Sequence, residues 1–132
     1  MWINEEILEE GDFGFVYKIT NLTNAKIYIG KKQLIFTRRK RLGKKEKALT
    51  PRKTYKTVTK ESDWRTYYGS NKVLLEDIRA GHDIKREILC SCKTKALLTY
   101  FETKYQFVES VIERDTYNDS VLGKFYRKIF DV

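Results

Sequence analysis

The chain has 132 residues, of which 41% are hydrophobic and 14% aromatic, and this composition is typical of one folded domain with a real core. The net charge is +9, and no apolar run approaches the roughly 20 residues that a membrane span needs. The acidic start, MWINEEILEEGD, lacks the basic region of a secretion signal. We therefore expect a cytoplasmic protein with no membrane partner.

The cysteines and the single histidine give little support for a metal–thiolate site. Cys90 and Cys92 form a C-x-C pair, and His82 is the only histidine. Because a zinc site needs about four ligands, two reduced thiols are the favoured interpretation.

Positive charge is concentrated in one segment of the chain. Residues 31–60 hold 13 Lys and Arg against a single acid, Glu46, whereas the remaining residues hold 14 basic and 17 acidic side chains. A basic segment beside a folded core is typical of a protein that binds a phosphate polymer. The alternative is a solubilising run or a short import signal, RRKR, but the basic segment extends well beyond such a signal.

The apolar pattern predicts two strands near the start of the chain. Residues 2–9 are consistent with a short helical turn, and residues 13–20 alternate between two faces as a strand does. A second strand at 26–30 follows the polar turn NLTNAK, so the pair forms a hairpin. Tyr17 and Tyr28 then lie on neighbouring strands and can face a common site if the register brings them together.

The segment after this hairpin lacks a regular apolar pattern. Residues 31–63 contain the one proline and few large apolar side chains, which predicts a long, partly mobile loop with a short helix after Thr37. Trp64, Tyr67 and Tyr68 then return the chain to the core.

Two helices and a third strand follow. Ser70 or Asn71 can cap a helix that runs through Arg79, and a strand is expected at 83–92. A longer helix is expected over about 95–112. This helix is capped by Thr94 and carries an apolar stripe formed by Leu97, Phe101, Tyr105 and Val108.

The predicted order is β-β-α-β-α, followed by a tail, VLGKFYRKIF, that closes the core as a short strand or helix. This order favours an α+β fold: a small sandwich with a three-stranded, mostly antiparallel sheet flanked by helices. We expect residues 1–132 to form a single domain in which 31–63 is a basic loop insertion.

A few polar residues are candidates for chemistry when taken together. Arg38 follows Tyr28 by ten residues, and Glu102 lies at the edge of the apolar stripe, where its carboxylate can face a cleft. Taken singly, a strand tyrosine such as Tyr17 is usually a packing residue, and a helix glutamate usually faces solvent. The combination is what indicates a site.

The two aromatic runs resemble the signature of the GIY-YIG nuclease family. FVY at 15–17 stands where GIY would, YIG at 28–30 is literal, and the two tyrosines are 11 positions apart, as in the family. The resemblance continues downstream with Arg38, with Glu102 on a later helix and with Asn118 in TYNDS. It covers most of the chain.

The chain is most similar to small phage-type members, in which a basic insertion precedes a W-x-x-Y-Y-G-S stretch, here residues 64–70. It departs from the family pattern at Gly14, one place before the usual glycine, and at Leu42, where many members carry His or Tyr. The candidates to replace that proton-transfer residue are Tyr68, Lys31 and Lys32. Homing members often add a separate DNA-binding domain, for which this chain has no room.

The resemblance implies metal-dependent hydrolysis of phosphodiester bonds in DNA. Glu102 would hold Mg²⁺ or Mn²⁺, and Arg38, with Arg39 as the alternative, would bind the scissile phosphate. Tyr17 would orient or deprotonate the attacking water, and Tyr28 would hydrogen-bond the phosphate or Tyr17. The full expected catalytic set is Tyr17, Tyr28, Arg38, Tyr68, Glu102 and Asn118, in which Asn118 orients Glu102 or a neighbour.

The expected partner is double-stranded DNA, with a homodimer as one arrangement on it, in the cytoplasm of a bacterial host if the protein is phage-encoded. The expected DNA-binding residues are Lys31, Lys32, Arg39, Lys40, Arg41, Lys44, Lys45, Arg52 and Lys53. A non-enzymatic basic nucleic-acid-binding protein is the alternative, because it needs only the basic run. A structural phage or ribosome-associated protein is a weaker one. Nicking and double-strand cleavage both remain open.

Overall fold

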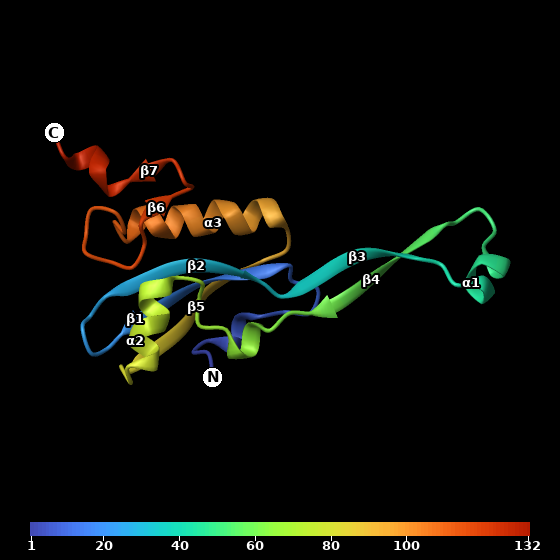
Figure 1. Cartoon of the computed structure of the whole chain (residues 1–132), viewed down its shortest axis with the longest axis horizontal. Helices are drawn as coiled ribbons and strands as arrows, with labels where there is room; N and C mark the ends of the chain where they lie inside the picture. Colours follow the sequence, from blue (N-terminus) through green and yellow to red (C-terminus); the bar gives the residue numbers. More distant parts are fainter.

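The computed structural model describes residues 1–132, and its centre is a three-stranded antiparallel sheet in the order β2-β1-β5 (Figure 1). The strands are β1 (Gly14–Asn21), β2 (Ile27–Gln33) and β5 (Ile84–Cys92). β1 is central, so β2 lies at an edge with one side unpaired. The predicted α+β fold with a three-stranded antiparallel sheet is confirmed.

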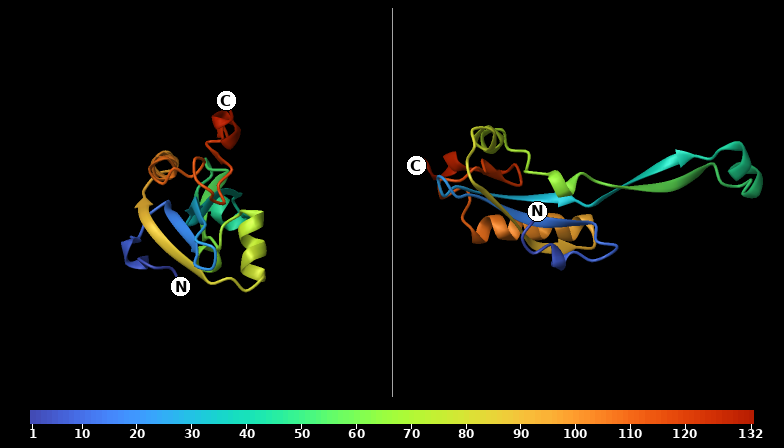
Figure 2. Two further views of the ribbon diagram at one scale, coloured as in Figure 1. Left: turned by 90° about the vertical axis from the view of Figure 1, so that its left-hand side faces the viewer. Right: turned by 90° about the horizontal axis from the view of Figure 1, so that it is seen from below.

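Helices cover both faces of this sheet. α3 (Lys95–Val108) lies over one face, and α2 (Lys72–Arg79) lies on the other (Figures 1 and 2). The 3-10 segment η2 (Trp64–Thr66) leads into α2, and η1 (Glu5–Ile7) packs beside β5. None of the helices combines the length and the hydrophobicity that a membrane span requires.

The alternation of side chains along β1 produces a hydrophobic cluster on each face. The cluster on the α2 face contains Trp2, Phe15, Tyr17, Ile19, Leu34, Trp64, Leu74, Ile88 and Tyr117. The cluster on the α3 face contains Val16, Ile27, Ile29, Cys92, Leu98, Val111, Ile112 and Val121. Tyr17 therefore belongs to the first core, and α3 covers the second.

Both predicted helix caps are confirmed. The Asn71 side chain accepts a hydrogen bond from the Leu74 N–H at 2.9 Å, and the Thr94 hydroxyl accepts one from the Leu97 N–H at 3.2 Å. Each bond satisfies a backbone donor that the first turn leaves free.

The apolar stripe predicted for α3 is partly wrong. Leu97 and Val108 are 44% and 67% exposed, whereas Leu98 is only 3% exposed. Phe101 and Tyr105 pack against the core as expected. The buried face follows the spacing i, i+3, i+7 from Leu98, and α3 ends at Val108, not at about residue 112.

Residues 31–63 do not form the predicted loop. β3 (Ile35–Arg41) and β4 (Tyr55–Glu61) pair along their whole length, and α1 (Lys44–Leu49) lies near the tip. This ribbon, residues 35–61, projects from the domain and is called the arm (Figures 1 and 2). Most of its side chains are exposed on both faces, so no apolar alternation marks its strands in the sequence.

The tail folds back over the end of α3. It contains β6 (Ser120–Val121), β7 (Phe125–Tyr126) and η3 (Arg127–Phe130). The Arg127 guanidinium donates hydrogen bonds to the carbonyls of Val111, Thr116 and Asn118 at 2.9, 3.0 and 2.8 Å. These bonds fix the loop that carries Asn118.

Candidate active site at the edge of the sheet

The two tyrosines of the signature lie on one face of the hairpin. Tyr17 pairs with Gly30, and Ile19 pairs with Tyr28, so the rings are diagonal neighbours with centroids 6.1 Å apart. Tyr17 is 1% exposed, whereas Tyr28 is half-buried at the edge strand. The register therefore brings the pair together, with Tyr17 inside and Tyr28 toward solvent.

A third tyrosine completes this cluster. The Tyr67 ring packs edge-on against Tyr17, with centroids 6.0 Å apart. Tyr68, the expected member, instead lies against the Arg86 guanidinium, 4.1 Å from its ring centroid. The two side chains point apart because consecutive residues of an extended segment alternate sides, and nothing in YYGS indicates which one points inward.

Glu102 reaches the same edge from the opposite face of the sheet. Tyr28 and Glu102 both line a cleft of about 310 Å³, whose other walls are Asn71, Gln106, Tyr117, Asn118, Asp119, Ser120, Leu122 and Gly123. The Lys31 ammonium lies 4.0 Å from the Glu102 carboxylate. The Glu102 side chain is 18% exposed, and this burial raises its pKa, an effect that Lys31 opposes.

The donor set of this cleft fits a hard divalent cation. Its two carboxylates are Glu102 and Asp119, and the chain has no group of three or more His, Cys, Asp and Glu side chains that could hold a metal. Mg²⁺ is usually held by one or two carboxylates together with waters and substrate phosphates. Oxygen ligands of this kind suit Mg²⁺ or Mn²⁺.

The buried phenols are protonated at neutral pH. Burial raises the pKa of Tyr17 well above its ordinary value of 10, and the neighbouring Tyr28 and Tyr67 raise it further. Burial also raises the pKa of Tyr28, although a hydrogen bond with Ser70 opposes the shift. In the free protein both groups are therefore hydrogen-bond donors and not phenolate bases.

Two lysines follow the YIG motif on opposite sides of β2. Lys31 lies on the Glu102 side, whereas Lys32 pairs with Phe15 on the face of Tyr17. The Lys32 ammonium is 2.6 Å from Asp63 and 4.1 Å from the centroid of the Tyr67 ring. The edge strand therefore carries one cation on each face of the sheet.

Asn118 lies in the wall of the cleft but does not bond Glu102. Its carboxamide oxygen accepts from the Ile29 N–H at 2.9 Å, and its amide donates to the Ile29 carbonyl at 2.8 Å. Gln106 donates to the same carbonyl at 3.1 Å. Asn118 thus holds the YIG strand to the tail; of the two expected arrangements, orientation of Glu102 or of a neighbour, the free protein shows no direct bond to Glu102.

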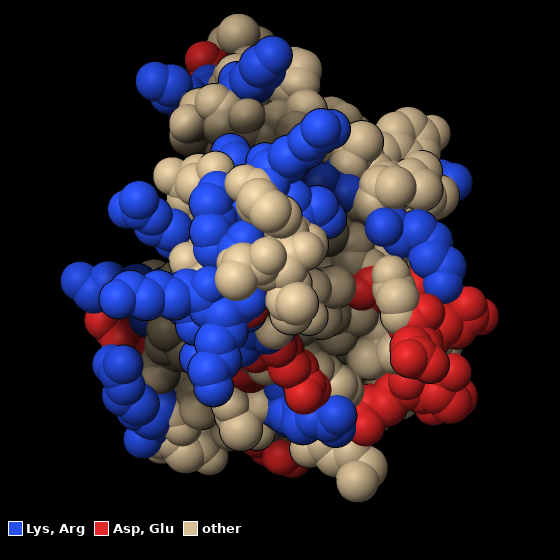
Figure 3. Space-filling view, turned by 90° about the vertical axis from the view of Figure 1, so that its right-hand side faces the viewer, with Lys and Arg blue, Asp and Glu red and all other residues tan.

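Arg38 and most of the expected DNA-binding residues lie on the arm. Arg38 pairs with Val58, is exposed and lines no part of the cleft. Viewed from the arm's end of the molecule, Lys and Arg cover much of the surface, and the largest group of Asp and Glu lies at the right (Figure 3). The structure brings Tyr17, Tyr28, Glu102 and Asn118 together and leaves Arg38 and Tyr68 outside this group.

The fold and the cleft define a small α+β nuclease domain. Residues 2–129 match the family described as "Putative endonuclease segE, GIY-YIG domain". The chain belongs to the GIY-YIG family, whose members are endonucleases that hydrolyse DNA phosphodiester bonds. No curated protein and no solved structure matches the chain.

Proposed function

We propose that this protein is a metal-dependent endonuclease that cleaves double-stranded DNA at the edge of its sheet. One observation carries the proposal: Tyr28 and Glu102 line a single cleft, with Tyr17 packed behind Tyr28 and Lys31 4.0 Å from Glu102. Phenol donors, a carboxylate and a cation around one hollow are the groups that bind and polarise a phosphodiester.

The divalent cation would be Mg²⁺ or Mn²⁺, held by Glu102, with Asp119 as the second carboxylate of the cleft. When bound, such an ion neutralises charge on the phosphate and assists departure of the leaving oxygen. The raised pKa of Glu102 makes its carboxylate a stronger base than an exposed glutamate, and it must be ionised to hold the ion.

The tyrosines would act on the phosphate as donors. Tyr28, the more exposed of the pair, donates to a non-bridging oxygen, and Tyr17 keeps the Tyr28 ring in place from within the core. Tyr17 lines no part of the cleft in the free protein, so its phenol would influence the attacking water through Tyr28. Because its pKa is raised, we assign it no base role at neutral pH.

The lysines beside the YIG motif would neutralise the scissile phosphate. Lys32 is held by Asp63 on the tyrosine side, and Lys31 lies on the carboxylate side. Arg38 would act with the arm on neighbouring phosphates unless DNA brings the arm across the cleft. Each chain has one such cleft, so we propose that nicks precede double-strand breaks.

Supercoiled plasmid tests the proposal directly. With Mg²⁺ or Mn²⁺ the protein should convert supercoiled DNA first to nicked and then to linear form, and EDTA should stop the conversion. Glu102→Gln should bind the plasmid but leave it supercoiled. Binding without nicking in either metal would favour the non-enzymatic alternative and contradict the proposal.

A further inference from the structure

The arm has the form of an element that enters a groove of DNA. β3 and β4 make their extensive contacts only with each other, and they stand clear of the sheet (Figure 1). Seven paired residues at about 3.3 Å each give a ribbon roughly 23 Å long. The major groove of B-DNA, about 12 Å wide, admits a two-stranded ribbon of this kind.

The side chains on the two faces of the arm differ in how exposed they are. Directly paired residues share a face, which assigns Thr37, Arg39, Arg41, Tyr55, Thr57 and Thr59 to one face, called the open face. Every one of these side chains is exposed. On the other face Lys56 and Val58 are half-buried, and Glu46 of α1 forms an ion pair with Lys56 at 2.7 Å. The open face is therefore the more completely exposed of the two.

The chemistry of the open face suits base edges better than phosphates. Threonine hydroxyls and methyls bond bases and contact thymine methyls, and an arginine fork binds guanine O6 and N7. The opposite face carries Arg38, Lys40 and Lys60 beside the hydrophobic Phe36 and Val58. Lysine is a point charge that binds phosphates without reading sequence.

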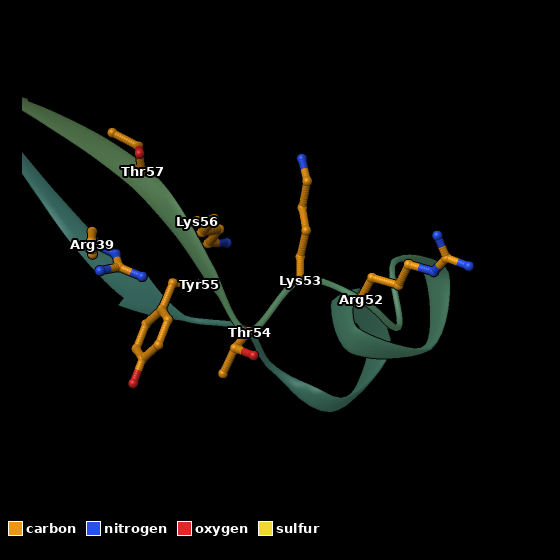
Figure 4. A pocket seen from close by; sticks show the side chains of 7 residues that line it. All are labelled: Arg39, Arg52, Lys53, Thr54, Tyr55, Lys56 and Thr57. Carbon is orange, nitrogen blue, oxygen red and sulfur yellow. The ribbon is translucent and has the colours of Figure 1, made fainter.

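Arg39 stacks on a tyrosine of the open face. Its guanidinium lies over the Tyr55 ring, 4.6 Å from the centroid, and the two residues line a hollow of about 570 Å³ with Thr57 (Figure 4). Figure 4 also shows Arg52 and Lys53 further toward the tip. An arginine fixed by stacking loses less freedom when it binds a base.

We propose that the arm lies in the major groove of duplex DNA with its open face toward the base pairs, and that this contact gives the nuclease a sequence preference. The inference rests on the proposed function in one respect only, that the partner is duplex DNA. The charges of the opposite face and of the tip then bind the flanking phosphates and supply affinity that does not depend on sequence.

The first experiment selects bound duplexes from a randomised pool in EDTA, so that cleavage plays no part. Wild-type protein should enrich a short motif. Arg39→Gln and Lys40→Gln each remove one charge at adjacent positions on opposite faces. Arg39→Gln should lose discrimination at one base pair by roughly 5- to 150-fold, and Lys40→Gln should weaken all sequences equally, with a salt slope shallower by about 0.9.

Arg39→Lys is the control for misfolding of the arm, because it keeps the charge while removing the planar fork. It should retain the wild-type salt slope but discriminate less strongly at the same base pair, because lysine lacks the planar fork. Thr57→Val, which replaces the hydroxyl by a methyl group, should change preference at a neighbouring position. If all three open-face variants enrich the wild-type motif as strongly as the wild-type protein does, the open face does not read bases and the inference fails.

Base analogues then test the groove. Replacing guanine in the motif by 7-deazaguanine removes a major-groove acceptor and should weaken wild-type binding, whereas inosine removes a minor-groove amino group and should not. The reverse pattern would place the arm in the minor groove and overturn the proposal. Enrichment of no motif would also overturn it, even if the plasmid is nicked. A selected motif without nicking would contradict only the proposed function.

Discussion

Gly30 lies directly against the ring of Tyr17, so closely that a side chain at this position has no room. A Cβ built on Gly30 would come within 2.6 Å of the Tyr17 Cζ and still closer to the hydroxyl. The glycine of the YIG motif therefore exists to admit the tyrosine of the first motif across the strand pair. The signature is a packing unit as well as a set of chemical groups.

Gly30→Ala should consequently displace the Tyr17 ring and destabilise the domain by about 1–3 kcal/mol, because the surrounding core cannot shift without strain. Urea unfolding followed by fluorescence measures this. Gly43→Ala is the matched control, since the nearest atom to its added Cβ is a flexible Glu46 oxygen at 3.8 Å. A Gly30 variant as stable as the Gly43 variant would mean that the ring moves freely.

Glu102→Gln should abolish cleavage, by more than about 100-fold, and leave the fold at least as stable as before. The raised pKa means that the folded protein binds the Glu102 proton more tightly than the unfolded chain does. Stability from this group is therefore present at low pH and is lost as pH rises through the raised pKa. At neutral pH the ionised carboxylate opposes folding, and glutamine removes that cost. Plasmid nicking measures the loss of cleavage, and thermal unfolding of the same protein sample measures the stability.

Asn118→Ala should cost about 1–3 kcal/mol, since it leaves the Ile29 N–H without its partner in a buried position. Activity should fall as β2 loses its attachment to the tail. Asp115→Asn changes a nearby exposed side chain, 83% accessible, and should alter neither quantity. Recovery of full activity in Asn118→Ala at low temperature would show that Asn118 acts only through stability.

Tyr17→Phe tests whether the inner phenol donates or accepts a proton. The protonated form is fully present below the raised pKa and is lost only as pH rises through it. The ratio of wild-type to Tyr17→Phe rates should therefore stay constant between about pH 7 and about pH 9. A ratio that grows tenfold with each pH unit would instead assign the phenolate as the general base.

Much of the fold was predictable because strong local signals agreed with the tertiary structure. The alternation in β1 and the caps at Asn71 and Thr94 are local chemistry, and the structure confirms them. The arm was not predictable, because a ribbon exposed on both faces has no apolar period to detect. For such a segment, the amino-acid composition reveals the charge but not the hydrogen bonds that pair the two strands.

The position of a site residue was predictable only where the sequence offered a single candidate for it. Tyr17 and Tyr28 lie side by side, as the hairpin allowed, and Tyr28 and Glu102 line one cleft, as the family resemblance implied. Tyr67 replaced Tyr68 beside Tyr17 because side-chain direction after η2 depends on backbone geometry that the letters do not encode. Asn118 lines the same cleft, and its side chain bonds the Ile29 backbone, a contact that sequence reasoning rarely anticipates.

Arg38 and Lys32 provide the sharpest test of where the phosphate is bound. Lys32 lies beside the tyrosine cluster, and Arg38 lies on the arm. Neutralising each side chain should therefore affect different kinetic parameters. Arg38→Gln should raise KM and leave the saturated rate close to wild type, because an arm contact is equally strong in ground and transition states. Lys60→Gln, a charge-matched change on the same face of the arm, should behave alike.

Lys32→Gln should lower kcat itself, by about 10²-fold, because a cation beside the scissile phosphate acts most strongly as charge develops there. Loss of its ion pair with Asp63, which is 69% exposed, should cost no more than about 1 kcal/mol of stability, so the variant should fold. Single-turnover rates at saturating DNA separate the two cases. If Arg38→Gln remains slow at saturation while Lys32→Gln recovers, the arm closes over the cleft and Arg38 binds the scissile phosphate. In that event Lys32 would serve only to hold η2 and Tyr67 against the edge strand.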